Sequence, residues 1–160
     1  MKRTAIYPGT FDPITLGHVD VVTRGLKLFD CLVIAVADNP AKCPMFDVET
    51  RLAMVRETFV DEPRVEVTSF DGLLVDLAHA HQSDAILRGL RAASDFEYEF
   101  QMATMNRRLD AQIETAFVMA REDYTFVSSR FIREISSMGG DVSKLVPATV
   151  LSRLDDKYRQ

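Results

Sequence analysis

The feature that most constrains this chain is a regular alternation of short apolar runs with longer segments of helical pattern. The runs are rich in β-branched residues and predict strands at residues 4–7, 32–37, 65–68, 85–87 and 115–119. Helical patterns lie between them at residues 17–29, 48–59, 73–81 and 96–109, and two further helices close the chain. Strands that alternate with helices are typical of a parallel sheet covered by helices on both faces. The predicted fold class is therefore α/β, with a five-stranded parallel sheet.

Polar residues next to these patterns predict where two helices begin. Asp47 precedes the second helix, and its short carboxylate can accept hydrogen bonds from the exposed amides of the first turn. Ser128 or Ser129 can do the same for a helix over residues 131–138. Two glycines at residues 139–140 end that helix, and Pro147 opens the last one.

Length and charge limit the classes of partner. A chain of 160 residues, 47% of them hydrophobic, can bury one core, which predicts a single domain over residues 1–160. The formal net charge of -5 and the isoelectric point near 5.2 give no general attraction to nucleic acid or to an anionic membrane. We therefore expect small-molecule partners, and neither nucleic acid nor membrane.

Targeting and metal-binding signals are missing from the sequence. Residues 1–6 run straight into a turn without the apolar segment of a signal peptide, and no stretch reaches membrane-spanning length. The cytoplasm is therefore the predicted compartment. Cys31 and Cys43 form neither a CxxC pair nor a cluster with histidine that suits zinc, so we interpret them as structural thiols and predict no metal held by the protein.

Five connections between strands and helices have unusual compositions, at residues 8–16, 38–46, 69–72, 88–95 and 120–127. In a parallel sheet with right-handed crossovers, each connection from a strand to the next helix lies at the same edge, where ligands bind. We therefore expect all five connections to open on one cleft.

The first connection carries the strongest local signal. Residues 8–18 contain two prolines and two glycines, follow a strand directly and lead into a helix. Gly17 allows a phosphate to approach the helix start, where free amides and the helix dipole favour an anion, and His18 can donate a hydrogen bond to that phosphate. The alternative is that Gly17 and His18 merely open a helix. The segment is neither the GxxxxGK[ST] of a Walker A loop nor a GxGxxG fingerprint.

Two other connections present cations. Lys42 stands between two prolines, which is a rigid way to hold an ammonium group near a phosphate, although an isolated lysine is more commonly a solvated surface residue. Arg88 and Arg91 flank a glycine that lets the backbone approach a ligand. Arginine suits phosphate binding because its planar fork matches phosphate oxygens.

Several motifs, taken together, resemble a known family. The TxGH element at residues 15–18, preceded by GTFDP, resembles the signature of the HxGH nucleotidyltransferase superfamily, whose members share a Rossmann-like fold and release pyrophosphate. The stretch LRGLRAASDFEYE at residues 87–99 resembles the RGLRxxxDFEYE segment of bacterial phosphopantetheine adenylyltransferases, and the NPxKxPxF and VSSRFIRE segments also occur in the family's order. The resemblance implies that the chain joins the AMP part of ATP to 4′-phosphopantetheine, giving dephospho-coenzyme A and pyrophosphate in coenzyme A biosynthesis.

The resemblance also implies residue roles, with His18 as stabiliser of the transition state. It places the acceptor at Thr10, Lys42, Leu74 and Arg88. It places ATP at Thr10, Phe11, His18, Gly89, Leu90, Arg91, Glu99, Tyr124, Thr125, Phe126, Val127, Ser128, Ser129 and Arg130. Members of the family use Mg²⁺, which the ATP phosphates would carry, form homohexamers and are inhibited by coenzyme A.

Three of these residues have simpler structural interpretations. Leu74 continues an apolar helix face, and Glu99 lies in a run of carboxylates that is solvated in most proteins. Arg130 stands where the family usually has a third hydroxyl residue, so its guanidinium either adds a phosphate contact or turns outward.

The implied reaction needs no general base, because the acceptor phosphate is already ionised and attacks the α-phosphorus of ATP in line, without a covalent enzyme intermediate. Positioning and neutralisation of charge suffice. Two alternatives are a sister nucleotidyltransferase with another acceptor, such as nicotinamide mononucleotide, and a non-catalytic adenine-nucleotide sensor. The segment at residues 87–99 disfavours the first, and the presence of His18, Lys42 and Arg91 disfavours the second.

Overall fold

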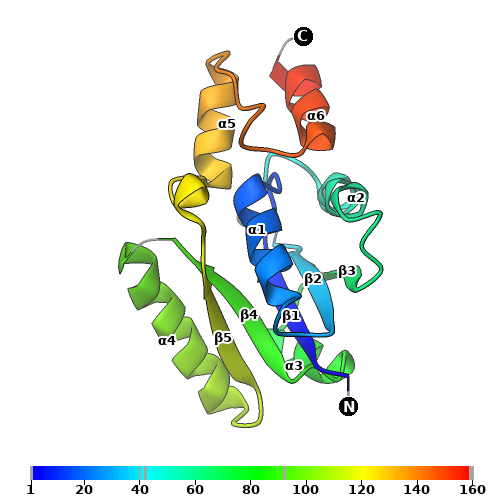
Figure 1. The fold of residues 1–160 in the computed structure, drawn as a ribbon, viewed down its shortest axis with the longest axis vertical. Helices are drawn as coiled ribbons and strands as arrows, with labels where there is room; N and C mark the ends of the chain where they lie inside the picture. The colour runs from blue at the N-terminus through cyan, green and yellow to red at the C-terminus, as the bar shows by residue number, and fades with distance from the viewer. Residues whose placement is uncertain (1, 40, 42, 92, 159–160) are drawn as a thin grey trace.

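Five parallel strands form one sheet in the computed structural model, which describes residues 2–39, 41, 43–91 and 93–158. The strands are β1 (Thr4–Gly9), β2 (Cys31–Ala37), β3 (Val65–Phe70), β4 (Ala85–Leu90) and β5 (Glu114–Met119). Their order in the sheet is β3-β2-β1-β4-β5 (Figure 1). The predicted five-stranded parallel sheet is confirmed.

Helices cover both faces of this sheet, as predicted (Figure 1). They are α1 (Leu16–Gly25), α2 (Val48–Thr58), α3 (Leu74–Ala80), α4 (Ala93–Leu109), α5 (Ser129–Ser137) and α6 (Ala148–Tyr158), with a short 3-10 helix at Glu122–Tyr124. Side chains of α1, α2, α5 and α6 belong to one buried cluster, and those of α3 belong to a second cluster on the opposite face.

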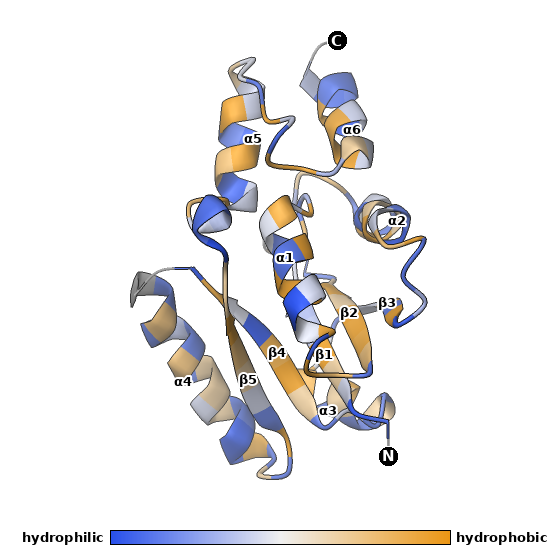
Figure 2. Cartoon of the chain, viewed as in Figure 1, coloured by the Kyte–Doolittle hydropathy of each residue, from blue (hydrophilic) through white to orange (hydrophobic). Residues whose placement is uncertain are grey.

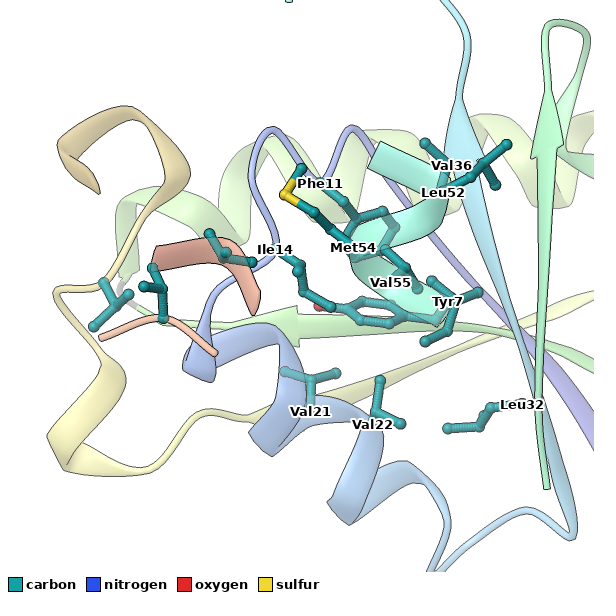
Figure 3. Packing of buried hydrophobic residues seen from close by; sticks show 14 of the residues in the cluster. Tyr7, Phe11, Ile14, Val21, Val22, Leu32, Val36, Leu52, Met54 and Val55 are labelled. Carbon is teal, nitrogen blue, oxygen red and sulfur yellow. The ribbon is translucent and has the colours of Figure 1, made fainter. Parts of the chain in front are cut away.

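The two clusters arise from the alternation of side chains along the central strands. Tyr7 and Leu32 point into the cluster that contains Val22 of α1 and Val55 of α2, as Figure 3 shows. Ile6, one residue along β1, points into the other cluster. Strand β2 is buried on both faces and is apolar along its whole length (Figure 2).

The predicted helix caps are confirmed by their hydrogen bonds, although α5 begins at Ser129 rather than at residue 131. Asp47 Oδ1 accepts a hydrogen bond from the Thr50 amide at 2.7 Å. Of the two serines considered for α5, Ser128 is the cap, and its Oγ accepts from the Phe131 amide at 3.2 Å. Helix α1 begins at Leu16, one residue earlier than predicted, and ends at Gly25 rather than at residue 29.

The predicted strand ends were wrong at the edge where ligands bind. Strand β1 continues through Pro8 and Gly9, which pair with β2, and β4 continues through Arg88 to Leu90, which pair with β5. Prolines and glycines are depleted in strands, but here the pairing of a neighbouring strand determines the conformation. In the described part of the chain, no helix is both long and apolar enough to cross a membrane.

Candidate active site

The site lies where β1 and β4 separate. Strand β1 pairs with β4 only at Ala5 and Ile6, whereas its pairing with β2 continues to Gly9. The connection from β1 leads to α1 on one face of the sheet, and that from β4 leads to α4, which packs beside α3 on the other face. This is therefore the topological switch point at which open α/β sheets bind ligands. Proline is tolerated at position 8 because β4 does not pair with that residue.

Two adjoining hollows open at this point. The first hollow, of about 690 Å³, is lined by the end of β1, the first loop, the first turn of α1, the end of β4 and the start of α5. The second hollow, of about 920 Å³, lies between α4, the start of α3 and the ends of β2 and β3. Their linings share Pro8, Gly9, Thr10, Arg88, Tyr98 and Glu99. The single cleft that we expected is therefore divided.

His18 lies in the first hollow and is held from one side by the residue that caps its helix. Its Nδ1 accepts a hydrogen bond from the Thr15 amide at 3.0 Å, and the Thr15 hydroxyl lies 3.0 Å from the same nitrogen. Because Nδ1 is an acceptor, the neutral ring carries its proton on Nε2. Burial is the largest cause that lowers the pKa of His18, and the positive charges of Arg91 and Arg88 lower it further, to about 4. At neutral pH His18 is thus an uncharged Nε2–H donor.

The ring of Phe11 supports His18 through an unusual backbone. Phe11 has a φ of 48°, in the left-handed region that side chains rarely adopt. This conformation buries its ring, which lies 5.0 Å from the His18 ring and 5.4 Å from that of Tyr7. A Cβ atom at Gly9 would lie 2.9 Å from the Phe11 ring, so position 9 requires glycine. Figure 3 shows Phe11 and Tyr7 among the other side chains of this buried cluster.

Arg88 stands on the boundary between the two hollows. Its Nε and NH2 donate to the two carboxylate oxygens of Glu99, both at 2.6 Å, and its NH1 donates to the Pro8 carbonyl at 2.8 Å. Burial opposes the charge, but the bonds to Glu99 outweigh it and raise the pKa of Arg88. Three of its five N–H bonds are thereby used, which leaves two for a ligand. Glu99 is 8% exposed and is occupied in holding Arg88.

Arg91 joins the end of β4 to the segment before α5. It donates to Asp95 at 3.1 Å and to the Val127 carbonyl at 3.0 Å. Gly89, which we expected to admit a ligand, has a packing reason as well. A Cβ atom there would lie 2.6 Å from a methyl group of Val21 on α1, so glycine is what allows α1 to approach β4.

The stretch from Tyr124 to Arg130 contributes only part of its length to the first hollow. Tyr124, Val127, Ser128, Ser129 and Arg130 line it. Among the described residues, Leu90, Thr125 and Phe126 lie outside this lining although they were predicted to contact ATP. Ser129 Oγ donates to the Pro13 carbonyl at 2.8 Å, so its proton is already used, whereas Ser128 accepts from an amide and keeps its proton for a ligand.

Three of the four residues predicted to bind the acceptor line the second hollow. Thr10, Leu74 and Arg88 line it, and Leu74 also packs against the buried cluster on that face. Lys42 lies outside the described residues. Sequence reasoning missed the contribution of α4, whose Met102, Met105 and Asn106 complete this hollow, because the family motif ends before them.

Asp12 and Arg133 are further residues of the first hollow that sequence reasoning missed. Asp12 is 3% exposed, and its carboxylate accepts from the amides of Met45 at 2.8 Å and Phe46 at 2.9 Å. Arg133 NH1 lies 3.3 Å from the same carboxylate and also donates to the Asp12 carbonyl. An acidic residue inside the GTFDP motif was the available signal.

Metal ligation by the protein is not supported by the side chains of the first hollow. In the parts of the chain that are described, no three His, Cys, Asp or Glu residues form a group that could hold a metal ion. The lining carboxylates Asp12, Asp95 and Glu99 each already pair with an arginine. An ion that accompanies a phosphate ligand would therefore be held chiefly by the phosphate oxygens, as is common for Mg²⁺.

Two known structures share the fold of this chain. A protein from Vibrio parahaemolyticus described as a nicotinate-nucleotide adenylyltransferase superposes with a TM-score of 0.71 at 22% identity, covering 100% of this chain and 97% of that chain. A lipopolysaccharide core biosynthesis protein from Thermoplasma volcanium gives a TM-score of 0.58 at 24% identity, covering 76% of this chain and 100% of the other. The profile of the cytidylyltransferase-like family matches residues 6–135. The class is thus a Rossmann-like nucleotidyltransferase.

Sequence comparison identifies the family more narrowly. A phosphopantetheine adenylyltransferase of Anaeromyxobacter sp. is 57% identical over 157 residues, which cover 98% of this chain and 96% of the relative. One from Methylococcus capsulatus is 56% identical over 158 residues, covering 99% of this chain and 98% of the relative. The chain belongs to the phosphopantetheine adenylyltransferase family of cytidylyltransferase-like enzymes.

Proposed function

We propose that this enzyme transfers the adenylyl group of ATP to 4′-phosphopantetheine, giving dephospho-coenzyme A and pyrophosphate. The observation that carries the proposal is the meeting of two hollows at Thr10 and Arg88. The first hollow has the His18 donor and the start of α5, which suit a nucleotide polyphosphate. The second is a mixed apolar and polar groove beside α4, which suits an extended pantetheine arm.

In this arrangement the acceptor phosphate reaches the boundary from the second hollow and attacks the α-phosphorus of ATP in line. Arg88 can hold that phosphate through its two remaining N–H bonds, with Lys42 as its proposed partner. The Nε2–H of His18 donates to an α-phosphate oxygen as charge develops there. Arg91 and the Ser128 hydroxyl steady the triphosphate. The attacking phosphate is already ionised and the pyrophosphate leaves as an anion, so no residue has to remove or donate a proton.

Four further properties are part of the proposal. Mg²⁺ bound to the ATP phosphates would offset charge on the leaving pyrophosphate. Coenzyme A, which shares the pantetheine arm, is the proposed feedback inhibitor. The cytoplasm, where ATP and the acceptor are found, is the proposed compartment. A homohexamer is the proposed assembly, and it is supported by apolar side chains exposed on α4 and α5, including Phe100, Met105 and Phe131.

The test is pyrophosphate release from ATP and Mg²⁺ with three acceptors in parallel: 4′-phosphopantetheine, nicotinamide mononucleotide and glycerol phosphate. We expect rapid release with 4′-phosphopantetheine alone, and formation of ATP when dephospho-coenzyme A and pyrophosphate are supplied. Equal rates with nicotinamide mononucleotide would favour the sister enzyme. Binding of ATP without turnover on any acceptor would favour the adenine-nucleotide sensor.

A further inference from the structure

Arg51 is a buried cation that the proposed chemistry does not use. It belongs to α2, is 1% exposed, and lies outside the linings of both hollows. Its Nε donates to the Phe46 carbonyl at 3.0 Å, and its NH1 donates to the carbonyls of Thr10 and Ala37, both at 2.8 Å. One guanidinium therefore joins three segments of backbone.

Each of these carbonyls belongs to a segment that forms the substrate site. Thr10 lines both hollows. Ala37 is the last residue of β2, and Phe46 immediately precedes the cap of α2, so Arg51 ties together the two ends of the connection in which Lys42 stands in the sequence. The guanidinium thereby fixes the first loop and this second connection relative to each other.

Asp12 holds the same junction from the opposite side. Its carboxylate accepts from the Phe46 amide, while the Phe46 carbonyl accepts from Arg51. The residue Phe46 is thus fixed at both its N–H and its C=O by buried charges of opposite sign. These two contacts define where the second connection meets the first loop, without direct contact between the two charges.

Packing alone does not account for an arginine at this position. Removing a guanidinium from water is costly, and carbonyl oxygens compensate less than a carboxylate would. Neighbours on the same helix that only fill the core, such as Met54 and Val55, are apolar. The planar fork of arginine is the side chain that can donate to several carbonyls in different directions at once.

We propose that Arg51 is a positioning residue for the acceptor phosphate, acting through Thr10 and through the connection that contains Lys42. The inference rests on the proposed role of those two residues. Residues proposed for ATP alone, including Arg91 and Ser128, lie on other elements and do not contact Arg51. Loss of Arg51 therefore weakens use of the acceptor more than binding of ATP.

The test compares Arg51→Met with Arg51→Lys in the full-length enzyme. Because displacement of a substrate group by about 1 Å can cost about 10²-fold in rate, we expect Arg51→Met to lower kcat/KM for 4′-phosphopantetheine by about 10- to 100-fold. The dissociation constant for ATP, measured by calorimetry, should change by less than about 3-fold, which is much smaller than the expected loss of kcat/KM for the acceptor. Arg51→Lys, which can still donate to part of the carbonyl set, should recover part of the loss.

Met54→Ala is the matched control, because Met54 is fully buried on the same helix and contributes only packing. It should lower Tm without the selective effect on the acceptor. If Arg51→Met does not fold, Arg51→Lys alone decides, and a lowered Tm with normal KM for the acceptor would overturn the proposal. Equal losses for ATP and acceptor, or the same acceptor defect in Met54→Ala, would also overturn it. Failure of the proposed function itself would be seen separately, as absent turnover in the unmutated enzyme.

Discussion

His18→Asn separates the two things that His18 does in this structure. The Nδ1 of histidine and the Oδ1 of asparagine are both bonded to Cγ, so asparagine can still accept the Thr15 amide that Nδ1 accepts at 3.0 Å. Asparagine lacks any group at the place of Nε2, the proposed donor to the phosphate. The substitution therefore keeps the cap of α1 and removes the donor to the phosphate.

The magnitude follows from these contacts. Losing one preorganised donor to a developing oxyanion costs about 10²- to 10³-fold in turnover, or about 3 to 4 kcal/mol, so His18→Asn should lose at least that much in kcat. Its ATP dissociation constant should move far less, because the bond matters most in the transition state. His18→Ala should lose the same activity and, in addition, about 1 kcal/mol of stability with the capping acceptor, a fall in Tm of about 2 to 4 °C.

Steady-state pyrophosphate release, ATP calorimetry and melting curves on the two variants supply the measurements. A folded His18→Asn protein with more than about one tenth of normal turnover would remove His18 from the mechanism. If His18→Asn instead lost Tm and both substrate affinities together, the role of His18 would be structural.

Three further substitutions or conditions test the site. Acidification should destabilise the enzyme relative to His18→Asn. The pKa of His18 in the folded enzyme is about 4, below the ordinary value of 6.5, so the unfolded chain takes up the proton first as the pH falls between these values. The free energy of unfolding should therefore fall by at most about 3 kcal/mol. Urea unfolding from pH 7 to pH 4.5 measures this loss, and the same pH dependence in the enzyme and in His18→Asn would contradict it. Glu99→Gln should raise KM for the acceptor several-fold more than the ATP dissociation constant, because Glu99 holds Arg88; a larger loss of ATP affinity would instead support direct contact with ATP. Arg130→Ser should raise KM for ATP modestly, and unchanged kinetics would place Arg130 in solvent.

The fold could be predicted almost completely from the sequence, because the spacing of apolar residues and the length of each apolar run reflect which residues are buried. The strands at residues 32–37 and 115–119 were predicted with only their first residues missed. Among the strands, the errors lie at residues that were predicted to be loops, namely Pro8, Gly9 and residues 69–70 and 88–90. These residues are strand because a neighbouring strand pairs with them, and the sequence of one strand does not contain that information.

The site could be predicted residue by residue only where a motif covered it. His18, Thr10, Arg88 and Arg91 were placed at the hollows by their motifs. The bonds that fix those residues come from elsewhere: Arg51 is bonded to Thr10 across 41 positions of sequence. Such a contact follows from the crossover of α2 over the sheet, so it could not be derived from spacing along the chain.

The charges that line the first hollow largely cancel, so we expect its arginines to act on a phosphate through fixed hydrogen-bond donors rather than through net positive charge. Of the four described arginines that line it, three are paired with carboxylates: Arg88 with Glu99, Arg91 with Asp95 and Arg133 with Asp12. In each pair the carboxylate holds the guanidinium in place before a substrate binds, but it also cancels the positive charge of that guanidinium. The fourth lining arginine, Arg130, has no ion pair within the described residues, and His18 is neutral. In the proposed complex, the triphosphate would therefore meet oriented N–H donors more than excess positive charge. Such donors favour a transition state whose geometry matches them, and the remaining negative charge would be offset by the cation that we propose ATP carries.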